Sequence, residues 1–244
     1  MTFAQPSHIP RFLSSAGIQK VIAFSGGASS VPAELGEAGN TLSQASAVLE
    51  AAIIKDALLK LKLYASHIAI LTGGTGWGIP ALASREAKAL GFKTIGIFPK
   101  RGIDSALGED TLDLRVCVDT DPDFCCETQE QRAKFASEWG DESACFAKTL
   151  DGMIVMSGRA GTLVEVAHVL KINEGRVKRN RPTKMIVPIA YGGGTAETVG
   201  HLPADPEVRH RCMPADVIRT GRAAALFLIN KLDLEDAFNE PTAA

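Results

Sequence analysis

The chain has 244 residues, of which 45% are hydrophobic, and its formal net charge is −2. This length and apolar content allow a sizeable buried core, and we expect a single domain over residues 1–244. The slightly acidic charge balance argues against nucleic acid or a membrane surface as a partner.

Cysteine, histidine and apolar patterns indicate where the protein works. The five cysteines include no CxxC pair, and the five histidines form no HExxH motif. Such an odd set of cysteines is typical of reduced cytosolic thiols, and we expect no metal site. We find no signal peptide pattern and no apolar stretch near the roughly 20 residues that span a bilayer. The sequence therefore predicts a cytoplasmic protein.

Short apolar runs alternate with helical patterns along the chain. The runs are apolar throughout, which is typical of parallel strands that are covered on both faces. The expected strands are residues 21–24, 68–71, 94–98, 114–118, 153–156 and 184–189. The expected helices are residues 42–63, opened by a capping box at 41–44, 80–90, 127–150, 162–173 and 215–232. This alternation predicts an α/β fold with a doubly wound, mainly parallel sheet and helices on both of its faces.

Glycine-rich loops follow four of the expected strands, at residues 25–29, 72–78, 157–162 and 191–195. The carboxyl ends of parallel strands share one edge of the sheet, where doubly wound folds bind ligands. Glycine lets a ligand approach the backbone, and a helix N-terminus offers free N–H groups to a phosphate. The loops therefore predict a nucleotide or phosphate site. No GKS or GKT and no GxGxxG occurs in them, which disfavours ATP hydrolysis and ordinary NAD chemistry.

Two segments resemble a known family. "ILTGGTGWGIPALASREAKALGFKTIGIFPK" and "LDGMIVMSGRAGTLVE" are similar to the LOG-like group, long called lysine decarboxylases, which carries a Gly-Gly loop and a later PGGxGTxxE signature. The resemblance implies a Rossmann-like fold over about residues 20–190. Members include phosphoribohydrolases that release a base from nucleoside 5′-monophosphates, and molybdenum cofactor carrier proteins share the fold. The sequence has no recognisable pyridoxal-phosphate lysine motif, so we do not expect a lysine decarboxylase.

The signature is kept only in part. Ser157 stands at the family's proline, and Arg159 replaces its second glycine. The active phosphoribohydrolases also have an arginine upstream, and counting back from Asp151 puts Glu142 at that place. Arg132 could serve there only if the helix carries an insertion. The residues that match the signature are Gly158, Gly161, Thr162 and Glu165.

The resemblance and the loops together give a set of candidate site residues. Base release needs a phosphate anchor and a carboxylate beside an oxocarbenium-like ribose, and Glu165 is the expected catalytic residue. Alternatively, Glu165 only complements the helix dipole. Arg159 either contacts the phosphate or points away from it. The expected phosphate- or nucleotide-binding residues are Ser25, Gly26, Gly27, Gly73, Gly74, Thr75, Gly158, Arg159, Gly161 and Thr162.

Two further side chains are weaker candidates. His168 follows Glu165 by one helical turn and could face the same cleft, whereas Trp77 could stack on a base. A surface or packing role is the more common one for both.

The sequence favours a nucleotide- or phosphorylated-ligand-binding protein, with hydrolysis of an N-glycosidic bond as its candidate activity. The alternative is a non-enzymatic binder, such as a molybdenum cofactor carrier or a nucleotide sensor. We expect a bound nucleotide or phosphate, and the sequence identifies no cofactor with certainty. Because LOG-like proteins are commonly dimers, we also expect a homo-oligomer built on a dimer.

Overall fold

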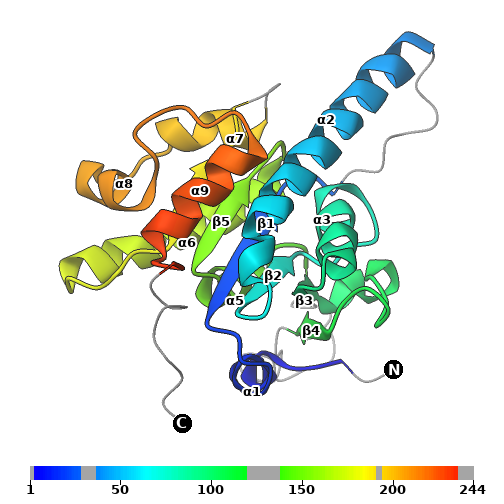
Figure 1. Ribbon diagram of the computed structural model, residues 1–244, viewed down its shortest axis with the longest axis horizontal. Coiled ribbons are helices and arrows are strands. Elements are labelled where there is room, and N and C mark those ends of the chain that lie inside the picture. Colours follow the sequence, from blue (N-terminus) through cyan, green and yellow to red (C-terminus); the bar gives the residue numbers. More distant parts are fainter. Residues whose placement is uncertain (1–2, 29–36, 120–137, 191–193, 236–244) are drawn as a thin grey trace, which may run out of the picture.

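The computed structural model describes residues 3–28, 37–119, 138–190 and 194–235, and a parallel sheet lies between two layers of helices (Figure 1). The strand order is β4-β3-β2-β1-β5-β6, and every neighbouring pair is parallel. This confirms the expected Rossmann-like, doubly wound α/β fold. The strands are β1 (Lys20–Ser25), β2 (Ile68–Thr72), β3 (Lys93–Pro99), β4 (Leu114–Val118), β5 (Gly152–Val155) and β6 (Met185–Pro188).

The strands are apolar throughout because each one faces two cores. In β1, Ile22 and Phe24 belong to one buried cluster, whereas Val21 and Ala23 belong to the other. Successive side chains of a strand point to opposite faces, so a strand that is covered on both faces needs an apolar residue at every position. All six expected strands are therefore present; β4 has the predicted bounds, and the ends of the other strands differ from the prediction by at most one residue.

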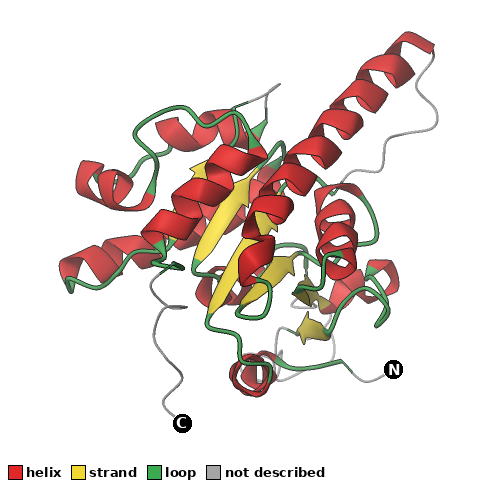
Figure 2. Ribbon diagram, viewed as in Figure 1, coloured by secondary structure: helices red, strands yellow, loops and turns green. Residues whose placement is uncertain are grey.

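The two helical layers divide the remaining elements (Figure 2). Helices α2 (Glu37–Leu61), α3 (Gly78–Ala89) and α9 (Gly221–Lys231) cover one face. The other core receives side chains from α1 (Ile9–Ser15), α5 (Ser143–Thr149), α6 (Ala160–Lys178), α7 (Thr195–Thr198) and α8 (Pro206–Cys212). Short 3-10 turns occur at Pro6–His8, Lys62–Tyr64, Lys100–Ser105 (η3) and Val199–His201.

Several expected helix bounds were wrong. The helix expected at 42–63 already includes Glu37, so residues 41–44 lie inside it and do not cap it. The helix expected at 162–173 continues through Gly175 to Lys178. The helix expected at 215–232 begins only at Gly221, because Ile218 pairs with Ile189 as an extension of the sheet. The short helices α1, α7 and α8 were not expected.

The helix expected at 127–150 is only partly described. Its last part is α5, which begins at Ser143. Residues 120–137 lie outside the described residues, and with them Cys125, Cys126 and Arg132. The single domain over residues 1–244 stays a prediction. Within the described part of the chain, no helix is long and apolar enough to cross a membrane.

Helices α2 and α9 pack at very short range where α9 begins. A Cβ atom at Gly221 would lie 1.9 Å from the carbonyl oxygen of Ile53 and 2.6 Å from the backbone nitrogen of Ala57. The backbone N–H of Arg222 also donates to Asp56 of α2, at 2.6 Å. Glycine at position 221 is therefore a condition of this helix contact.

We predict that Gly221→Ala lowers the free energy of unfolding by about 3 kcal/mol, because the added methyl group meets backbone atoms that cannot rotate away. Urea denaturation measures this change. The matched control is Gly200→Ala, whose Cβ would have no neighbour within 4 Å. We expect it to change stability by less than about 0.5 kcal/mol. Equal stability of the two variants would contradict the close packing of α2 on α9.

Candidate functional site

A cavity of about 420 Å³ opens at the carboxyl edge of the sheet. It lies beside the point where the strand order reverses, between β1 and β5, and the loop after β2 also contributes to its wall. Connections on either side of such a switch point run in opposite directions and leave a crevice. Nine of the eleven predicted site residues line this cavity: Ser25, Gly26, Gly27, Gly73, Thr75, Arg159, Gly161, Thr162 and Glu165.

The other two predicted residues, Gly74 and Gly158, are not among the residues that line the cavity. Gly74 has φ +67°, and a Cβ atom there would lie 2.9 Å from Cδ1 of Phe98. A Cβ atom at Gly158 would lie 2.2 Å from Oγ1 of Thr162. Both glycines therefore shape the loops behind the cavity wall, because a side chain at either position would push the loop out of place.

The loop that precedes α6 accommodates its arginine without strain. Arg159 is the residue before the helix, and its φ of −121° is open to any residue. The side chain of Arg159, the N-cap residue, makes no capping hydrogen bond, and the first turn of the helix has no acidic residue. The first helical hydrogen bond at this end runs from the backbone N–H of Leu163 to the carbonyl of Arg159, at 3.0 Å. The N–H groups of residues 160–162 thus lack a helical partner, as at any helix start.

Three of the glycine-rich loops are tied to one another by backbone hydrogen bonds. The N–H of Gly27 donates to the carbonyl of Ser157 at 2.5 Å, and the N–H of Ile79 donates to the carbonyl of Gly27 at 2.9 Å. Gly78 has φ +64°, and a Cβ atom there would lie 2.2 Å from the oxygen of Gly27. The loops after β1, β2 and β5 therefore form one connected rim around the cavity.

The fourth glycine-rich loop supports the third one. The N–H of Thr195 donates to the carbonyl of Gly158 at 3.0 Å, and its hydroxyl donates to the carbonyl of Arg159 at 3.0 Å. Neither Gly194 nor Thr195 lines the cavity, and residues 191–193 lie outside the described residues. The described part of this loop thus fixes the turn before α6 from behind.

Two carboxyl groups stand in the cavity wall, on Glu142 and Glu165. Burial raises the pKa of Glu165 to about 8, and the charge of Glu142 adds to this rise. The hydroxyl of Ser25 donates to the Oε2 atom of Glu165 and opposes the rise. Burial also raises the pKa of Glu142, although backbone N–H groups, including that of Gly140 at 2.9 Å, oppose this. Near neutral pH, Glu165 therefore holds a proton in the folded protein.

One buried hydroxyl in the wall has no hydrogen-bond partner among the described residues. Thr75 is 7% exposed, and its Oγ1 atom makes no hydrogen bond to any of them. Buried polar groups are normally paired, so an unpaired one in a cavity wall is a candidate ligand contact. Thr75 was part of the predicted site for its place in the loop alone.

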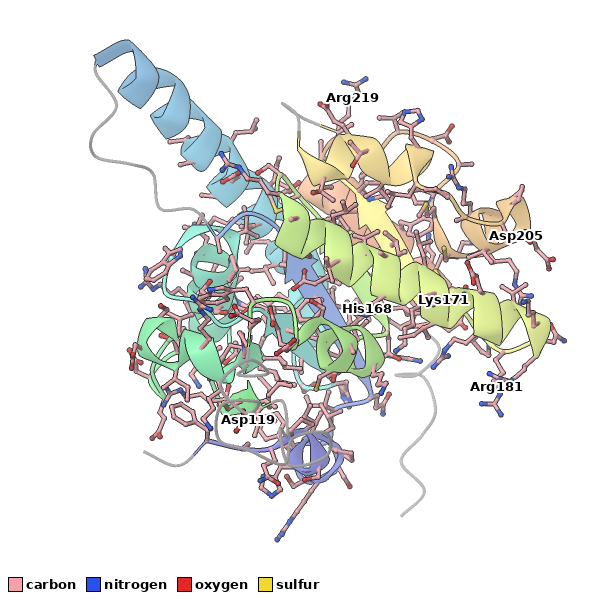
Figure 3. All side chains as sticks on the ribbon, turned by 180° about the vertical axis from the view of Figure 1, so that it is seen from behind. Asp119, His168, Lys171, Arg181, Asp205 and Arg219 are labelled. Atoms are coloured by element: carbon pink, nitrogen blue, oxygen red, sulfur yellow. The ribbon has the colours of Figure 1, made fainter. Side chains whose placement is uncertain are left out.

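Sequence reasoning missed part of the wall and included two side chains that do not line it. Trp139 lines the cavity, although no motif marks it, whereas Trp77 does not line it. Glu142 had a signal, because its distance before Asp151 matched the family's arginine position. His168 lies on α6, where Figure 3 labels it, but it is not among the cavity-lining residues. In the described ranges, no group of three or more His, Cys, Asp or Glu side chains could hold a metal ion.

Solved structures with this architecture identify the fold. The molybdenum cofactor binding protein from Rippkaea orientalis superposes with a TM-score of 0.54 at 18% identity, over 88% of this chain and 98% of that chain. The molybdenum cofactor carrier protein from Chlamydomonas reinhardtii gives 0.52 at 15%, over 88% and 99%. This chain has the fold of the molybdenum cofactor carrier proteins.

The structural genomics target TM1055 shares the same architecture, with a TM-score of 0.58 at 14% identity over 87% of this chain and 99% of that chain. No protein-family model and no curated protein matches the sequence. At these identities, the molybdenum cofactor carrier fold is what the chains have in common. It is the fold that the LOG-like resemblance implied.

The protonated state of Glu165 predicts a pH dependence of stability. Its pKa is about 8 in the folded protein against an ordinary value of 4.5, so the folded state binds more protons than the unfolded state between these values. Stability is therefore lost as the pH rises from about 4.5 to about 8, at up to about 1.4 kcal/mol per pH unit. Glu165→Gln keeps an acceptor for Ser25 and cannot ionise.

We predict that Glu165→Gln gains stability over the wild type across this window and that the gain levels off above about pH 8. Urea denaturation of both proteins at intervals between pH 5 and 9 measures it. A stability difference that is the same at every pH would mean that Glu165 is not protonated by burial.

Proposed function

We propose that the protein binds a phosphorylated small molecule of the nucleotide type in this cavity, with the phosphate at the N-terminus of α6. The uncapped start of α6 carries the proposal, since Ala160, Gly161 and Thr162 all line the cavity. Free N–H groups at a helix start and the positive end of the helix dipole favour an anion there. Arg159 adds a full positive charge to the same part of the wall.

The size of the cavity also supports a nucleotide-sized ligand. A volume of about 420 Å³ lies within the range of pockets for small molecules. The cavity combines a cationic rim at Arg159 with two carboxyl groups and the ring of Trp139. A ligand that carries both a phosphate and a ring with hydrogen-bond donors would match both kinds of surface.

Release of a base from a nucleoside 5′-monophosphate is the second candidate, and the two carboxyl groups favour it. A carboxylic acid that keeps its proton near neutral pH suits a general acid, which would protonate the departing base. Glu142, in place of the family's arginine, is a departure from the known hydrolases. For this reason we assign binding first and hydrolysis second.

The dimer and the cytoplasmic location stay predictions.

For the binding site, we predict that Gly161→Ala weakens binding of nucleoside 5′-monophosphates at least about tenfold, the loss expected when a charged hydrogen bond is disturbed. A Cβ atom at Gly161 would have no protein neighbour within 4 Å, so the methyl group would enter ligand space without disturbing the fold. Isothermal titration calorimetry measures the affinities. Gly175→Ala, in the same helix but not lining the cavity, is the matched control.

Unchanged affinity in Gly161→Ala, with affinities equal to those of Gly175→Ala, would contradict a phosphate at the start of α6. Nucleosides without a phosphate form a second comparison. They should bind more weakly than the monophosphates to the wild type, and Gly161→Ala should affect them less.

For the hydrolase candidate, we predict that Glu165→Gln lowers the rate of base release by about 10²- to 10⁴-fold, the usual contribution of a general acid. Affinity should change little, because glutamine has almost the same shape and still accepts a hydrogen bond from Ser25. Chromatographic detection of the free base measures the rate. If the wild type releases no base from any nucleoside monophosphate that it binds, the enzyme candidate is wrong and the binder stands.

A further inference from the structure

We infer that the wall segment formed by Trp139, Gly140 and Glu142 recognises the ring of the ligand, and that this ring is of the guanine type. The ring stacks on Trp139. Its ring N–H and the adjacent amino group donate hydrogen bonds to the Glu142 carboxylate. The inference rests on the proposed function and adds the chemical class of the ligand. These three residues line the cavity but are not part of the proposed phosphate site.

Glu142 is a carboxyl group without a cationic partner in the described part of the chain. None of the ion pairs there includes it, and its Oε2 atom accepts the backbone N–H of Gly140, at 2.9 Å. Burial raises the pKa of this carboxyl group, although backbone N–H groups partly oppose the rise. Removing a carboxylate from water is costly unless donors replace the water, and a ligand with N–H groups would supply them.

Trp139 provides the second feature of a ring site. It is 54% exposed although it lines the cavity, so much of the indole is open to contact. The ring lies against η3, because a Cβ atom at Gly102 would lie 3.1 Å from Cζ3 of Trp139. The same Cβ atom would lie 3.5 Å from Cδ of Pro99. Pro99 also lines the cavity. The edge of the benzene ring is thus held against η3 while much of the indole stays exposed, and an exposed indole in a cavity wall offers a stacking surface to a planar heterocycle.

The chemistry of a carboxylate selects among the heterocycles. An ionised carboxyl group only accepts hydrogen bonds, and its two oxygens can accept two parallel ones. Guanine offers a ring N–H and an amino group side by side, which fits this pattern. Adenine and cytosine place an acceptor nitrogen beside their amino group, which would face a carboxylate oxygen unfavourably. Uracil has one ring N–H between two carbonyl groups. A site that pairs with the guanine edge therefore rejects the other bases.

The test uses Trp77→Phe as the background, which leaves Trp139 as the protein's one tryptophan. This variant is titrated with GMP, AMP, CMP and UMP, the nucleoside 5′-monophosphates. We expect GMP to quench the fluorescence of Trp139 and to bind at least about tenfold more tightly than AMP. Adding Glu142→Gln should bring the affinity for GMP down to about that for AMP. The matched control is Glu138→Gln, because Glu138 pairs with Arg101 and does not line the cavity.

Three outcomes overturn the inference, and they separate it from the proposed function. Equal affinity for all four nucleotides, unaltered by Glu142→Gln, would reject the guanine-type ring and keep the phosphate site. Binding of inorganic phosphate that Gly161→Ala weakens, without any preference among nucleotides, would likewise reject the guanine-type ring and keep the phosphate site. If neither inorganic phosphate nor any of the nucleotides binds, the proposed function fails and this inference fails with it.

Discussion

The position of β1 in the middle of the sheet is the constraint on which the site depends. β1 pairs with β2 on one side and with β5 on the other, and the strand order reverses between β1 and β5. The loops after these strands therefore open on one crevice. The pairing brings Ser25, at the end of β1, to Glu165, which lies 140 residues later in α6. Without the β1–β5 ladder, neither the cavity nor the carboxyl wall would exist.

The cavity brings two opposite electrostatic environments together. The start of α6 and Arg159 favour an anion, whereas Glu142 and Glu165 form an acidic wall. Because burial raises the pKa of Glu165 to about 8, this group is largely protonated near neutral pH, and the acidic wall carries less charge than two ionised glutamates would. This reduces the repulsion of a phosphate in the same cavity. The acidic wall and the phosphate site are therefore compatible in one ligand site.

The sequence predicts the sheet well because its strands are buried on both faces, which leaves a continuous apolar signal. The loops of the site were also visible, since glycines such as Gly27 and Gly78 occupy positions at the contact between neighbouring loops, and a side chain at Gly78 would collide there. Trp139 could not be predicted, because only the approach of the segment before α5 to η3 brings it to the cavity. Likewise, the late start of α9 at Gly221 depends on the pairing of Ile189 with Ile218, which no local pattern shows.

A crystal structure of the protein soaked with a nucleoside 5′-monophosphate would show whether a phosphate binds at the N-terminus of α6. We expect phosphate density within hydrogen-bond distance of the backbone nitrogens of Gly161 and Thr162, with the guanidinium of Arg159 beside it. Phosphate density at any other place on the molecule, with the start of α6 occupied only by solvent, would contradict it.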